Sequence, residues 1–185
     1  APPAQTPSQP DVPDAAARAR IDALVDRGMS QLEGKRHEQA IAAFDEVLSI
    51  APDHLVAGYQ RANAFLAKGA TGDARAACDA ALTRLPGQPD LLMLSGAIAA
   101  AAHDPVGALE AFEQARTANP ELAGIDERIG EQLAFMGRGA EAIAAYDRGI
   151  ARQPGNVPLG SNRLFLLNHF GLFDRRRTFE AQTAT

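Results

Sequence analysis

The amino-acid sequence predicts an all-α solenoid built from antiparallel helix pairs. The first observation is a gapless 34-residue period, which divides the chain into four equal units: 21–54, 55–88, 89–122 and 123–156. The second is a proline at the same place near the end of every unit, at Pro52, Pro86, Pro120 and Pro154. The third is the spacing of apolar residues within each unit, which is helical and not alternating. A period of this length is typical of repeats that stack side by side, because one repeat alone cannot bury its hydrophobic face.

Each unit is expected to hold two helices, here named helix A and helix B. In the first unit, the apolar positions fall on one face of each helix: Leu24, Gly28 and Leu32 for helix A, then Ala40, Ile41, Phe44, Val47 and Leu48 for helix B. Short breakers at 34–35, 69–72, 103–105 and 137–139 separate the two helices of a unit. Asp104 followed by Pro105 is the clearest helix start, as an N-cap and a first helical residue. The closing prolines end helix B, since proline lacks the backbone N–H.

Other positions repeat with the same period. A small residue recurs in helix A, at Gly28, Ala62, Gly96 and Gly130, and another in helix B, at Ala40, Ala74, Ala108 and Ala142. A large side chain recurs in helix B at Phe44, Phe112 and Tyr146, and Cys78 takes its place in the second unit. Cys78 is therefore interpreted as a small core residue and not as a reactive thiol.

With these positions, residues 21–156 resemble four consecutive tetratricopeptide repeats. The resemblance implies a right-handed solenoid in which small residues let helices A and B approach, and the large residue fills the gap to the next repeat. The chain departs from the family near the start of helix A, where the usual aromatic residue is replaced by Leu24, Gly58, Leu92 and Asp126. Gly58 and Asp126 supply no bulky side chain, so the family's packing cannot be carried over to these two places.

The segments that flank the repeats have different compositions. Residues 1–13 hold five of the twelve prolines and are predicted to be a flexible arm, and residues 14–20 a leading helical segment with Asp14 as N-cap. Residues 157–173 resemble helix A of a partial fifth unit, or a capping helix, and 174–185 are expected to be a tail. Because 157–173 is apolar nearly all round, we expect a cover: the rest of a longer protein, a second copy, or 174–185 folded back.

Composition excludes several classes of function. The net charge is −5, and the only basic run is the triplet 175–177, so no nucleic-acid-binding surface is expected. No apolar run reaches the roughly 18 residues of a membrane-spanning helix. The single cysteine, Cys78, excludes an internal disulfide. The chain starts at Ala1 without a Met, which leaves a cytoplasmic and a periplasmic location both open, and its Ala, Arg and Gly content suits a GC-rich bacterial genome.

No pattern in the chain predicts catalysis, a cofactor or a metal. His37, His54, His103 and His169 are too far apart to share a metal on one helix face, and the first three are interpreted as solvated turn residues. Residues 137–142 fit G-x-G-x-x-A, but in a helix–helix turn and not after a strand. The acidic pairs Asp45-Glu46 and Asp126-Glu127 are interpreted as parts of solvated faces. The chain is therefore expected not to be an enzyme.

The resemblance implies that a ligand lies along the concave face made by the A helices. Carried over to this sequence, the partner-binding groove is predicted to contain Val25, Met29, Leu32, Tyr59, Asn63, Leu66, Met93, Leu94, Ala97, Arg128, Glu131 and Phe135. About half of these side chains are expected to be exposed. The lining is chiefly apolar, which suits a peptide or an amphipathic helix. Only Asn63 and Arg128 match the carboxylate clamp of one subgroup of the family, so that clamp is not expected.

Three functions remain open. The leading hypothesis is a non-catalytic scaffold or adaptor that binds a protein segment in the groove. The second is the substrate-selecting arm of a larger enzyme, because residues 161–168 resemble the stretch that follows the last repeat in glycosyltransferases of the O-GlcNAc transferase type. The third is self-association, through the N-terminal arm or through the C-terminal helix, with an interface of Phe165, Phe170 and Phe173.

Overall fold

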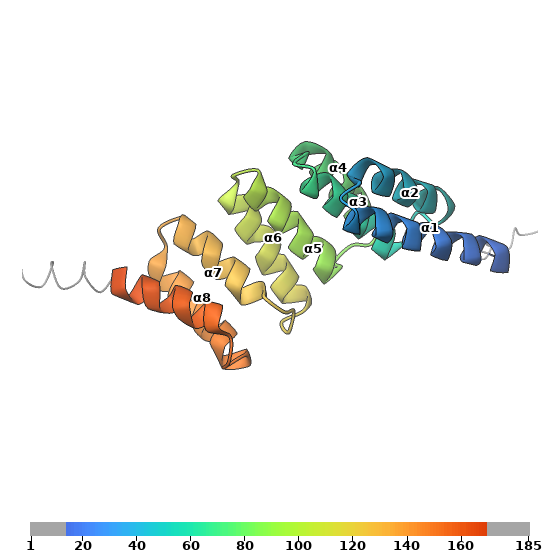
Figure 1. The fold of residues 1–185 in the computed structure, drawn as a ribbon. Helices are drawn as coiled ribbons and strands as arrows, with labels where there is room; N and C mark the ends of the chain where they lie inside the picture. Colours follow the sequence, from blue (N-terminus) through green and yellow to red (C-terminus); the bar gives the residue numbers. More distant parts are fainter. Residues whose placement is uncertain (1–13, 170–185) are drawn as a thin grey trace, which may run out of the picture.

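The computed structural model describes residues 14–169, and all the regular structure within that range is α-helical. Four antiparallel pairs form in chain order: α1 (Ala15–Glu33) with α2 (His37–Ile50), α3 (Leu55–Ala67) with α4 (Thr71–Arg84), α5 (Pro89–Ala101) with α6 (Pro105–Ala118), and α7 (Ile125–Phe135) with α8 (Gly139–Arg152). Residues 157–169 are helical as well. The pairs stack in one direction, so the molecule is elongated and its first and last described residues lie at opposite ends (Figure 1). The predicted all-α solenoid is confirmed.

Local signals in the sequence place the helix starts. The Asp14 carboxylate accepts a hydrogen bond from the Ala17 N–H at 2.7 Å, and residues 15–20 are the first part of α1, not a segment apart from it. The Asp104 carboxylate likewise accepts from the Gly107 N–H at 2.9 Å, which confirms the predicted start of α6. His54, expected to be a solvated turn residue, is the N-cap of α3, where its Nδ1 accepts from the Ala57 N–H at 3.2 Å.

The ends of the helices also follow the period. Each helix B stops two residues before its closing proline, at Ile50, Arg84, Ala118 and Arg152. Each helix A is followed by one residue with positive φ, and these residues are 34 positions apart: Lys35 (55°), Gly69 (82°), His103 (59°) and Gly137 (74°). Glycine adopts this left-handed conformation without a steric cost, whereas Lys35 and His103 carry the Cβ penalty.

The contact between the two helices of a pair depends on a missing side chain. Phe44, Phe112 and Tyr146 are at most 3% exposed, and their rings lie against Gly28, Gly96 and Gly130. A Cβ atom added to any of these glycines would stand 2.4 to 2.6 Å from a ring carbon. In the second pair, Ala62 and Cys78 share one core cluster, so a larger residue on helix A accompanies a smaller one on helix B.

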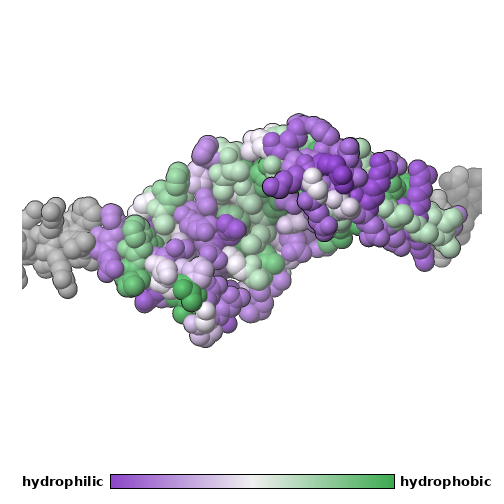
Figure 2. All heavy atoms as spheres, viewed as in Figure 1, coloured by the Kyte–Doolittle hydropathy of each residue, from purple (hydrophilic) through white to green (hydrophobic). Residues whose placement is uncertain are grey.

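The helix over residues 157–169 covers the end of the repeat array. Leu159 and Leu166 are buried in the core of the fourth pair, whereas Leu164 and Phe165 are 58% and 67% exposed. The inner side of this helix therefore packs on the repeat array, and its outer side exposes Leu164 and Phe165 together with polar residues such as Ser161 and Asn168. Hydrophobic residues lie at the surface at this end of the molecule (Figure 2). Phe170, Phe173, the tail 174–185 and the arm 1–13 lie outside the described residues.

Candidate functional site

The predicted groove residues come from helix A of each pair and form rows across neighbouring helices. Val25, Tyr59 and Met93 hold one position of the period on α1, α3 and α5. Met29, Asn63, Ala97 and Glu131 hold a second one, which continues to Phe165 in the last helix. Because α1 contacts α3 and α3 contacts α5, residues at one position of the period follow one another from repeat to repeat along the same side of the stack. The repeat therefore arranges these side chains as a strip.

Most members of this strip keep part of their surface accessible. Phe135 is 72% exposed and Met29 36% exposed, and Arg128 is exposed as well. The half-buried members are Val25, Leu32, Tyr59, Asn63, Leu66, Met93, Ala97 and Glu131. Leu94, in contrast, is 4% exposed and lies in the core with Cys78 and Ile98, so it offers a ligand almost no surface.

The polar members of the strip are paired only weakly. Arg128 Nη1 and Glu131 Oε2 lie 3.1 Å apart, one turn from each other on α7. Exposed pairs of this kind contribute about 0–1 kcal/mol, so a ligand can replace either partner at little cost. Asn63 Nδ2 donates to Gln60 Oε1 at 3.4 Å within α3. Burial, with a smaller effect from Asp90, raises the pKa of Tyr59, so its hydroxyl stays protonated at neutral pH and can donate.

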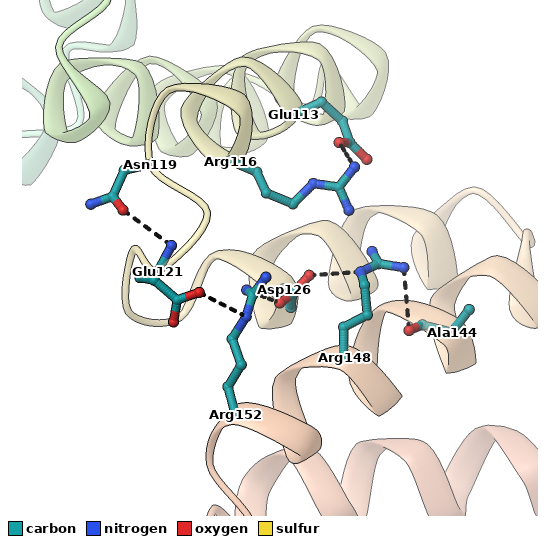
Figure 3. A network of polar contacts seen from close by, with 8 residues as sticks. All are labelled: Glu113, Arg116, Asn119, Glu121, Asp126, Ala144, Arg148 and Arg152. Carbon is teal, nitrogen blue, oxygen red and sulfur yellow. Dashed lines mark hydrogen bonds and ion pairs between the residues drawn. The ribbon is translucent and has the colours of Figure 1, made fainter.

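Asp126 is not part of a solvated face, as its sequence neighbourhood suggested. Its side chain is 3% exposed and lies between two arginines of α8 (Figure 3). Asp126 Oδ1 accepts from Arg148 Nε at 3.0 Å, and Oδ2 accepts from Arg152 Nη1 at 2.5 Å. Glu121 adds a second carboxylate, 3.9 Å from Arg152 Nε. Two guanidinium groups therefore compensate the charge of a carboxylate that the fold has removed from water.

A cavity of about 220 Å³ lies between the α2–α3 turn, α3 and α4. Its apolar wall includes Leu48, Gly58, Ala77, Ala81 and Leu85, and its polar lining consists of His54, Arg61 and Arg84. None of the predicted groove residues lines it. Sequence reasoning singled out Gly58 as a departure from the family but did not detect the cavity, whose walls come from two repeats.

The described residues 14–169 contain no cluster of three or more His, Cys, Asp or Glu side chains that could hold a metal ion. No helix in this range is both long and apolar enough to span a membrane. Cys78 is 1% exposed, and burial, with a smaller contribution from Asp79, raises the pKa of its thiol to about 11. The burial of Cys78 within a core cluster confirms its interpretation as a core residue, and its thiol stays protonated at neutral pH.

Comparisons with known proteins identify the type of repeat. Residues 31–98 match a family model of the tetratricopeptide repeat. The crystal structure of the MamA protein superposes with a TM-score of 0.73 at 18% identity, over 89% of this chain and 90% of that one. A structure from a functional characterization of Pseudomonas aeruginosa pilF gives 0.76 at 19% identity, over 89% of this chain and 75% of that one. A sequence comparison with curated proteins finds no match.

A third solved structure is described as YrrB, a TPR protein with an unusual peptide-binding site. It superposes with a TM-score of 0.67 at 19% identity, and the match covers 85% of this chain and 84% of that one. At such identities the three structures establish the fold and say nothing of this chain's own partners. The fold thus defines a helical-repeat protein, and the family match over residues 31–98 indicates repeats of the tetratricopeptide type, as the residues of the chain suggested.

Proposed function

We propose that this chain is a non-catalytic scaffold that binds a protein segment, a peptide or a short amphipathic helix, along the strip on the A helices. The observation that carries the proposal is the row of Val25, Tyr59 and Met93, whose side chains remain partly exposed on three successive repeats. Apolar side chains that recur at one position of a stack form a continuous patch, and such patches mark interaction sites. The peptide-binding site named in the description of YrrB supports the same class of ligand.

The chemistry of the strip suits a segment with its own apolar face. Met29 and Met93 have flexible, polarizable side chains, which adapt to ligands of different shape. Tyr59 and Asn63 supply hydrogen-bond donors and acceptors that can fix the register of a bound segment. Phe135 is the most exposed aromatic residue among those that line the strip, and it offers an anchor for a ligand that reaches α7.

The test selects binders from a random peptide library on the full chain and measures their affinity by fluorescence anisotropy. Tyr59→Asp and Met93→Glu are expected to weaken the selected peptides by about tenfold or more, since each change buries a charge under the ligand. The matched control is Val106→Asp on α6, an equivalent change at a 53% exposed residue of a B helix. Unchanged affinities in both strip variants, with helicity retained by circular dichroism, would reject the strip as the binding site.

The exposed residues Leu164, Phe165 and Leu167 favour a second proposal, self-association through the last helix. Light scattering on the full chain and on Phe165→Asp tests it. A concentration-dependent dimer that the substitution abolishes supports self-association, and a monomer at every concentration rejects it. No observation among the described residues favours the arm of a glycosyltransferase.

A further inference from the structure

Every helix pair has two residues that are 26 positions apart, one near the start of helix A and one near the end of helix B. In the first pair these are Leu24 and Ile50, which pack in one hydrophobic cluster. In the third pair they are Leu92 and Ala118, again both apolar. Neither repeat therefore has a charged group at these two positions, although Ala118 is exposed and only Leu24 and Ile50 share a cluster.

In the fourth pair the same place holds an ion pair. Asp126 stands at the position of Leu24, Arg152 stands at the position of Ile50, and their oxygen and nitrogen atoms are 2.5 Å apart. Arg148 supplies a second guanidinium, and Glu121, in the turn before α7, lies 3.9 Å from Arg152 (Figure 3). In this repeat, the arginine at the end of helix B forms an ion pair with a carboxylate at the start of helix A.

The second pair has the arginine but not the carboxylate. Arg84 occupies the position of Arg152, whereas Gly58 occupies the position of Asp126 and has no side chain. Asp53 occupies the position of Glu121 and lies near Arg84, with which it lines a neighbouring cavity. Among residues 14–169, the Arg84 side chain makes no hydrogen bond or ion pair. The cavity of about 220 Å³ lies at this place, with both Gly58 and Arg84 in its lining.

We propose that this cavity binds an acidic side chain, Asp or Glu, of a partner peptide, which gives Arg84 the carboxylate that Asp126 gives Arg152. Arg61 provides the second guanidinium, in the role that Arg148 has in the fourth pair. It is held in place by Asp45, 2.6 Å from its Nε, and by the Phe65 ring, 5.7 Å from its guanidinium carbon.

The walls of the cavity and its charges fit this ligand. Leu48, Ala81 and Leu85 contact the methylene groups of an inserted Glu or an apolar neighbour of the acidic residue. Asp53 adds a negative charge near this cavity, but the fourth pair tolerates the same arrangement. There Glu121, at the position of Asp53, lies beside Arg152 together with Asp126. A carboxylate between guanidinium groups forms charge-assisted hydrogen bonds, which are stronger than neutral ones. The cavity shares no residue with the strip on the A helices, so the two proposals can fail separately.

The test uses the full chain and three sets of acetylated random peptides that carry a fixed Glu, Gln or Lys at the centre. We expect the Glu set to bind about tenfold more tightly than the Gln set, in line with one charge-assisted hydrogen bond. Arg84→Gln should abolish this preference, and Arg84→Glu should shift it to the Lys set. Arg18→Gln is the matched control, since Arg18 is an exposed arginine of α1 whose side chain has no partner within 14–169.

An internal competitor gives an independent readout. Gly58→Asp supplies the carboxylate from within the chain and should weaken the Glu set, whereas Gly58→Ala adds the Cβ alone, 3.1 Å from the Ala81 Cβ, and serves as its control. The proposal is overturned if the wild-type chain binds the Glu and Gln sets equally, or if Arg84→Gln keeps the preference for Glu. Met93→Glu should leave the preference intact, and its loss in that variant would assign it to the strip instead.

Discussion

A Cβ atom on Gly96 would lie 2.4 Å from a ring carbon of Phe112, closer than two carbon atoms approach without a bond. Gly96→Ala must therefore separate α5 from α6 or push the ring off its rotamer. We expect a loss of about 1–3 kcal/mol in the free energy of unfolding, the usual cost of overpacking a core, measured by urea titration.

The control for this prediction is Gly72→Ala. Gly72 lies in the first turn of α4, and an added Cβ meets no atom within 4 Å. This change should leave stability unchanged or raise it by about 0.5–1 kcal/mol, because alanine has the higher helix propensity. Equal effects of the two substitutions would show that the Gly96–Phe112 contact is not under steric constraint.

The second pair predicts how the same clash can be relieved. Ala62 and Cys78 stand where the third pair has Gly96 and Phe112, so the chain itself contains the opposite combination of sizes. The double variant Gly96→Ala/Phe112→Cys should lose less free energy of unfolding than the two single variants added together. The expected coupling energy is about 1 kcal/mol or more. Strict additivity in a double-mutant cycle would contradict this.

Asp126 should matter to stability through its two arginines. Asp126→Ala removes the carboxylate from Arg148 and Arg152, whose side chains are 40% and 32% exposed and can regain water. We therefore expect a loss of about 1–3 kcal/mol rather than the larger cost of a fully buried charge. Asp126→Leu should lose less, because leucine fills this place in the first and third pairs. Glu131→Gln, which breaks an exposed pair, should cost less than about 1 kcal/mol.

How much of this could be predicted from the sequence depends on the distance over which each signal acts. The ends of the B helices follow from a proline two residues further on, and the start of α6 follows from Asp104 and Pro105. These are contacts within a few residues. The 34-residue period repeats the closing proline four times, whereas the Asp104–Pro105 start occurs once. The antiparallel pairs could therefore be predicted from the residues alone.

The surroundings of Asp126 could not be predicted in the same way. Its arginine partners follow 22 and 26 residues later, on another helix, whereas its sequence neighbour Glu127 suggested a solvated face. Leu94 and Met93 are adjacent in one helix, but Leu94 faces the core and Met93 only half faces it. A rotation of the helix by a fraction of a turn decides which of the two side chains faces the core, and helical periodicity in the sequence does not fix that rotation.

The left-handed turn residues predict a purely backbone effect. At Gly69 and Gly137 an added Cβ meets no atom within 4 Å, so Gly→Ala there changes only the cost of a positive φ. Each change should lower the free energy of unfolding by about 1 kcal/mol. The reverse substitution, Lys35→Gly, should gain up to a similar amount. Thermal unfolding of the three variants measures both signs, and a destabilised Lys35→Gly would contradict the account.

The thiol of Cys78 should be inert until the chain unfolds. It is 1% exposed and protonated at neutral pH, so a thiol reagent has neither access nor a thiolate to attack. We expect the full chain to react with a chromogenic disulfide only at denaturant concentrations that unfold it. Rapid reaction of the native chain would show that the second pair opens locally.

The burial of Cys78 also makes the free energy of unfolding depend on pH in the alkaline range. The pKa of Cys78 is raised from its ordinary value of 9.0 to about 11, so the folded chain holds this proton more tightly than the unfolded chain. The stabilisation is fully present below pH 9 and is lost between pH 9 and pH 11, where the unfolded chain ionises first. Cys78→Ala should flatten this decline in urea titrations.

Burial also raises the pKa of Tyr146, from 10.0 to about 12, so Tyr146→Phe should flatten a later part of the same decline of stability with pH. A decline that neither substitution alters would exclude both groups as its cause.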